Sequence, residues 1–111
     1  NNTFSIYKRT SSDSAGYALT IGGAGVSNAI STAAYAAGDV LNIRFRKSDA
    51  GLKVWVNATS SELTTSTAKA DFTASPTTVA AVKAGSSAFH AVESLTIWNE
   101  ALSDAELEAM Q

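Results

Sequence analysis

The chain has 111 residues, of which 45% are hydrophobic and 16% are charged, and these values suit one small globular domain with its own core. Eight basic and ten acidic residues give a net charge of −2, which argues against general nucleic-acid binding, because such binding needs a basic surface. The chain has no cysteine and no apolar run near the ~20 residues of a membrane-spanning helix, so cysteine chemistry is excluded and membrane insertion is not expected.

The N-terminal part of the chain is dominated by the alternation of apolar and polar residues that is typical of strands. This alternation predicts one strand over residues 4–9 and a second over residues 17–21, which ends at the turn Gly22–Gly25. The stretch 26–37 is rich in Ser, Thr, Asn and Ala, and it predicts at most a weak strand around residues 29–32.

The clearest predicted element is a β-hairpin in the middle of the chain. Apolar residues alternate with polar ones over Leu41–Arg46 and again over Leu52–Asn57. Between these runs lies Ser48–Gly51, where glycine can adopt the positive φ that a tight connection requires.

The C-terminal part predicts weaker strands and then a helix. Weak strands are expected around residues 62–67 and 78–83, and the apolar segment 89–98 suits a stronger one. A short helix follows, because Ser103 and Glu106 have the spacing of a capping box. Many short strands followed by one helix predict an all-β fold, an antiparallel jelly-roll-like β-sandwich with a short C-terminal helix.

Two stretches of the chain resemble a known family. Gly38–Arg46 and Leu52–Asn57 together look like the central hairpin of laminin G-like, concanavalin A-like lectin-glucanase domains. The stretch Leu95–Leu107, which contains Ala-Leu-Ser-Asp-Ala-Glu, is similar to the phrase that closes such domains. The stretches occur in the family's order and cover about half of the chain.

The resemblance implies a fold and a class of function. Domains of this family are mostly binding modules for carbohydrates or proteins, and in bacterial and phage proteins they often form non-enzymatic parts of surface or tail proteins. They are usually longer than residues 1–111, so we expect the C-terminal part of such a domain within a longer chain. Phe4 and Ile6 are then expected to pack against an upstream segment or a neighbouring subunit.

The polar face of the central hairpin is the candidate ligand-binding site. A turn centred on Asp49 and Ala50 sets Arg44 opposite Trp55, Arg46 opposite Lys53, and Asn42 opposite Asn57. An exposed indole can stack on a sugar ring while amide and guanidinium groups donate hydrogen bonds to hydroxyls or acidic groups. The predicted ligand-binding residues are Trp55, Arg44, Arg46, Asn57 and Asn42. The residues expected on the core side are Leu52, Val54, Val56, Ile43 and Phe45.

The alternative interpretation is that this face is packed, with Arg44 covering Trp55 through a cation–π contact. It is favoured by the usual burial of tryptophan. Trp98 lies between the last predicted strand and the helix, where an aromatic side chain is expected to pack the helix against the sheet.

The sequence does not favour an enzyme. Glycoside hydrolysis needs two carboxyl groups across the scissile bond, and no predicted strand carries such a pair, because Glu93 is isolated and the other candidates surround the terminal helix. His90 has no nucleophile motif near it. No cofactor is expected; calcium is conceivable but unsupported, since aspartates in loops usually form turns. The loop aspartates that could each supply one calcium ligand are Asp13, Asp39, Asp49 and Asp71.

These observations lead to two functional hypotheses. The first is a non-catalytic carbohydrate- or receptor-binding module of a larger extracellular or virion protein, such as a phage tail fibre, with a cell-surface glycan or polysaccharide as its partner. The second is a structural or oligomerisation domain without a glycan site, in which Ala-, Ser- and Thr-rich strands allow close approach of sheets. A homo-oligomer, such as a trimer, is compatible with both.

Overall fold

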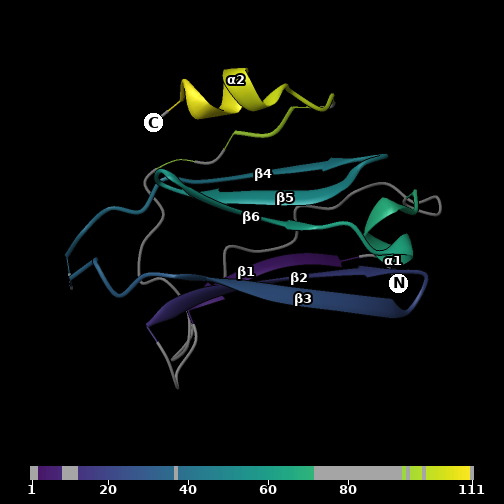
Figure 1. Cartoon of the computed structure of the whole chain (residues 1–111), viewed down its shortest axis with the longest axis horizontal. Helices are drawn as coiled ribbons and strands as arrows, with labels where there is room; N and C mark the ends of the chain where they lie inside the picture. The colour runs from purple at the N-terminus through teal and green to yellow at the C-terminus, as the bar shows by residue number, and fades with distance from the viewer. Residues whose placement is uncertain are drawn as a thin grey trace.

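The computed structural model describes residues 3–8, 13–36, 38–71, 94, 96–98 and 100–110. These residues form a mostly β structure with two antiparallel three-stranded sheets and two short helices (Figure 1). The first sheet consists of β1 (Thr3–Lys8), β2 (Ser14–Ile21) and β3 (Ala24–Ser31), in that order. The second consists of β4 (Ile43–Ser48), β5 (Gly51–Val56) and β6 (Thr59–Leu63), again in chain order. The helices are α1 (Ser66–Lys69) and α2 (Asp104–Glu108).

Two-residue turns connect the paired strands in three places. Gly22 and Gly23 join β2 to β3 with φ values of 59° and 89°, which suit the left-handed turns preferred in hairpins. Asn57, with φ 51°, begins the turn between β5 and β6, and asparagine is among the few side-chain-bearing residues that tolerate this region. The predicted connection at Asp49 and Ala50 is confirmed, because Ser48 pairs with Gly51.

The apolar core lies between the two sheets, which face each other in Figure 1. Both sheets contribute alternate residues to it, as expected when each sheet has one buried face. At one edge the Tyr17 hydroxyl donates to Ser61 Oγ at 2.9 Å, which gives this buried hydroxyl a partner across the sheets. The buried core residues are Ala15, Tyr17, Leu19, Ile21, Ile30, Leu52, Val54, Val56 and Ala68.

The edge formed by β1 and β4 is closed by aromatic side chains. The rings of Phe4 and Phe45 lie 4.1 Å apart between centroids. Phe4 and Ile6 pack against the core of this chain itself, as does Ile43. Phe45 was expected in the core but is 39% exposed, because its strand lies at the sheet edge, where one side of the ring faces solvent.

The helix α2 lies on the opposite face of the second sheet and forms a third layer (Figure 1). Its predicted capping box is confirmed: Ser103 Oγ accepts from the Glu106 amide at 3.3 Å, and Glu106 Oε2 accepts from the Ser103 amide at 2.8 Å. Leu107 is buried beneath the helix. Among the described residues, neither helix has the length and apolarity needed to cross a membrane.

Several predicted elements differ from the observed ones. The stretch 26–37 was expected to hold at most a weak strand, but β3 runs over Ala24–Ser31, because all eight of its residues pair with β2. The strand predicted over residues 62–67 is wrong in its second half. There Thr65 instead caps α1, with its Oγ1 accepting from the Ala68 amide at 3.2 Å.

Two further strand predictions concern the segment before α2. The predicted strand 78–83 lies outside the described residues. Within the predicted strand 89–98, the described residues, Ser94 and residues 96–98, are not in a strand.

Candidate functional site

The five predicted ligand-binding residues lie together on the face of the second sheet that points away from the core. Arg44 is directly opposite Trp55, as the hairpin register predicted. Asn42 and Asn57 flank this pair, because the Asn42 amide donates to Asn57 Oδ1 at 2.9 Å and the Asn57 amide donates to the Asn42 carbonyl at 2.9 Å. Arg46 pairs with Lys53 one step along the strands, so Lys53 belongs to the same face.

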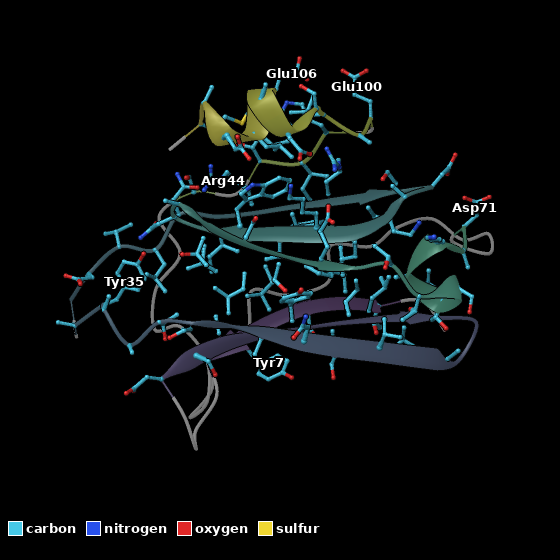
Figure 2. All side chains as sticks on the ribbon, viewed as in Figure 1. Tyr7, Tyr35, Arg44, Asp71, Glu100 and Glu106 are labelled. Carbon is cyan, nitrogen blue, oxygen red and sulfur yellow. The ribbon has the colours of Figure 1, made fainter. Side chains whose placement is uncertain are left out.

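The C-terminal segment covers this face. Trp55 is only 1% exposed, and its Nε1 donates to Glu108 Oε1 at 3.3 Å. Arg44 Nη1 donates to the Leu107 carbonyl at 2.7 Å (Figure 2), and Asn42 Nδ2 donates to the Met110 carbonyl at 2.9 Å. The prediction of an exposed indole, on which the sugar-stacking hypothesis depended, is therefore wrong. The face is packed, because a helix that begins almost fifty residues later covers the ring.

The charges on this face are matched by Asp104 of α2. Lys53 Nζ lies 2.6 Å from Asp104 Oδ2, and Arg46 Nη1 pairs with the other carboxylate oxygen. The cations over the Trp55 ring are Lys53, at 4.9 Å from the centroid, and Arg46, at 5.7 Å. The predicted cation–π partner Arg44 is thus wrong, since its guanidinium reaches past the ring to backbone carbonyls of Leu107 and Asn57.

These contacts shift the ionisation of two groups. The pKa of Asp104 lies below its ordinary value, mainly because Lys53 donates a hydrogen bond to the carboxylate, with Arg46 adding to the effect. The pKa of Arg44 is lowered by burial, an effect that the nearby charge of Glu108 partly offsets. The face is therefore an interface between sheet and helix in which Asp104 and Glu108 lie against three cations, Arg44, Arg46 and Lys53.

The shift at Asp104 predicts a pH dependence of stability. A carboxylate whose pKa is lower in the folded state stabilises the fold above its unfolded pKa, and this contribution is lost as the pH falls through the folded pKa. We expect Asp104→Asn to be less stable than the parent at pH 7 by at most ~1 kcal/mol, because the side chain is 44% exposed. The difference should shrink as the pH falls from 7 through the folded pKa of Asp104, because the carboxyl then binds a proton in both the folded and the unfolded state. Urea unfolding across this range measures it, with the exposed Asp71→Asn as control; a difference that is independent of pH would contradict the assignment.

The remaining predicted residues do not form a second site. Asp39 accepts from the Ala36 amide at 2.8 Å, which is the turn-forming role expected of loop aspartates. Within the described ranges, no group of three or more His, Asp or Glu side chains is placed to hold a metal ion. Trp98 was expected to pack the helix against the sheet but is 43% exposed, and Trp55 and Leu107 occupy that place instead. His90 and Glu93 lie outside the described residues.

A surface that the sequence interpretation missed lies on the outer face of the first sheet. Tyr7 of β1 pairs with Gly16 of β2, and a Cβ on Gly16 would meet Cε2 and Cζ of Tyr7 at 2.5 and 2.6 Å. The tyrosine ring thus lies directly on the backbone of β2, on the side away from the second sheet (Figure 2). Extending the period-two pattern back from Thr20 and Ala18 to Gly16 was the available signal, but the pairing of Tyr7 with Gly16 required the register between β1 and β2.

The described residues that surround Tyr7 in the sheet register are small and uncharged. The register places Ser5, Ala18 and Ser27 in one row across the sheet, and Thr3, Thr20 and Gly25 in the next. Among the described residues of the three strands, none with a charged side chain alternates onto this face. An aromatic ring surrounded by hydroxyl groups is thus presented on a paired, regular sheet.

Comparisons of this chain with protein-family models, with curated proteins and with solved structures found no match.

Proposed function

We propose that the chain is a non-catalytic carbohydrate- or receptor-binding module of a larger extracellular or virion protein. In this proposal the two facing sheets are part of a jelly-roll-like sandwich of the laminin G-like type. A cell-surface glycan binds on the outer face of the first sheet, with Tyr7 as its stacking platform. The observation that carries the proposal is the position of the Tyr7 ring on Gly16, within a face whose described residues carry hydroxyls and no charge.

The chemistry of this face suits a neutral sugar. A sugar ring has an apolar face of C–H groups that packs against an aromatic ring, while its hydroxyls need donors and acceptors around the ring. Ser5 and Ser27 are exposed and lie in the row next to Tyr7, and each hydroxyl can both donate and accept. Because Gly16 has no side chain, the tyrosine ring is held close to the sheet and does not have to be ordered on binding.

The test is a binding screen of the purified chain against neutral and acidic glycans, repeated with Tyr7→Ala. We expect the parent to bind a neutral glycan and Tyr7→Ala to bind it about tenfold more weakly or not at all, with an unchanged far-ultraviolet circular dichroism spectrum. Tyr7→Phe keeps the ring and should retain most of the affinity. Tyr35→Ala removes a tyrosine outside the sheet and is the matched control (Figure 2). Binding that Tyr7→Ala leaves intact would refute this site.

The same face also favours a second candidate, a structural or oligomerisation domain. Small side chains such as Ala18, Ser27 and Ala29 let another sheet approach closely, and the lack of charge removes a barrier to association. Ser27→Lys, which adds a charge to this face on the edge strand β3, separates the two cases when the solution mass is measured. A parent oligomer that Ser27→Lys converts to monomer supports association through this face, whereas a monomeric parent that binds glycans supports the first candidate.

A further inference from the structure

A cationic and aromatic face lies beneath an acidic C-terminal segment. We use "covered face" for Arg44, Arg46, Lys53 and Trp55, and "acidic cover" for residues 102–110. The helix within the cover carries three acidic residues and no basic one. Two of its carboxylates are directed to the sheet, Asp104 to Arg46 and Lys53, and Glu108 to the Trp55 nitrogen.

The acidic cover is held by polar contacts as well as by the burial of Trp55 and Leu107. Backbone carbonyls of Leu102 and Leu107 accept hydrogen bonds from Arg46 and Arg44, at 3.2 and 2.7 Å. Leu107 is the one residue of the described segment 100–110 whose side chain is buried. The core between the two sheets is formed on the opposite face of the second sheet, so it does not depend on the cover. Salt weakens contacts of this kind, because it screens exposed ion pairs.

The cover leaves part of the covered face without partners. The Nε atoms of Arg44 and Arg46 are buried and have no hydrogen-bond acceptor among the residues that the structure describes, and Arg44 is 7% exposed. A buried guanidinium donor without an acceptor is unfavourable, and a ligand with more acceptor oxygens would remove that cost. Carboxylate groups on sugar rings offer both the acceptors and an apolar ring face.

We propose that residues 102–110 are a displaceable cover, and that the face beneath binds an acidic polysaccharide whose carboxylates replace Asp104 and Glu108 while a sugar ring stacks on Trp55. The cover then acts as an internal competitor that keeps the face closed until the polymer displaces it. This site lies on the opposite side of the molecule from Tyr7 (Figure 2), so it does not depend on the proposed function.

The first experiment compares two variants that each lose two negative charges. Asp104→Asn with Glu108→Gln weakens the cover, whereas Asp71→Asn with Glu100→Gln changes exposed residues away from the covered face (Figure 2). The probe is polygalacturonate, with neutral dextran beside it, in a titration at low ionic strength. We expect the cover variant to bind polygalacturonate at least ~10-fold more tightly than the control variant, with no gain for dextran. Equal affinity of the two variants overturns the proposal.

A second measurement tests displacement directly and does not require the cover variant to fold. The chain has two tryptophans, so Trp98→Phe leaves Trp55 as the sole tryptophan, whose emission is followed with excitation at a wavelength that tyrosine does not absorb. We expect acrylamide quenching of Trp55 to rise several-fold between 0.05 and 1 M sodium chloride, while the far-ultraviolet circular dichroism stays constant. If quenching stays low until the whole protein unfolds, the cover is permanent and the proposal fails.

Discussion

Replacing Trp55 with alanine is expected to lower the free energy of unfolding by about 3 kcal/mol, which is near the lower end of the range for truncating a buried aromatic side chain to alanine. The indole is 1% exposed and lies between β5 and the C-terminal helix. Its removal leaves a cavity under Leu107 and deprives Lys53 and Arg46 of the ring they lie over. The value is near the lower end because one short helix, and not the core between the sheets, covers the ring.

Trp98→Ala is the matched control, because it removes the same side chain where 43% of the residue is exposed. We expect it to cost less than ~1 kcal/mol. Urea unfolding of both variants, followed by circular dichroism, gives the two values. Equal losses for Trp55→Ala and Trp98→Ala would mean that Trp55 is not packed beneath α2 in solution.

Replacing Gly51 with alanine should destabilise the fold by at least ~3 kcal/mol. Gly51 opens β5 with φ 129°, a conformation that residues with a side chain avoid. In addition, an added Cβ would lie 2.1 Å from the backbone oxygen of Leu63 in the neighbouring strand β6. The steric contact cannot be relieved without moving the hairpin relative to β6, because the contacting atom belongs to the backbone, and the strain of the positive φ adds to it.

Gly23→Ala separates the two causes. Gly23 also has a positive φ, 89°, but an added Cβ would meet no atom of the described residues within 4 Å. We expect it to cost about 1 kcal/mol, the conformational term alone. Chemical denaturation of the two variants measures the difference, and a loss at Gly51 no larger than that at Gly23 would contradict the close approach of β5 and β6.

The sequence predicted which residues share the polar face of the central hairpin, but it did not predict whether that face is open to solvent. The alternation of Leu41–Arg46 and Leu52–Asn57 placed Arg44 opposite Trp55, because register in a tight hairpin depends only on the turn and on which face is buried. Whether that face meets solvent depends on Glu108, which is 53 positions away from Trp55 along the chain. The usual burial of tryptophan favoured a packed face, but the local pattern does not show which segment covers it.

The Tyr7 surface was missed for a related reason. Tyr7 and Gly16 belong to strands whose pairing is set by the whole of β1 and β2, so their contact is a property of the sheet. Likewise, β3 carries few of the residues favoured in strands, and its eight pairs with β2 supply the hydrogen bonds that its composition did not predict.

The sequence by itself determined the features that rest on neighbours a few residues apart. The hairpin of β4 and β5, the glycine turn after β2 and the capping box at Ser103 depend on local backbone conformation and on side chains within one turn. The tertiary structure alone decided which faces are covered, since burial is settled by packing between segments distant in the chain. It therefore decided that Trp55 is enclosed while Tyr7 lies on an outer face.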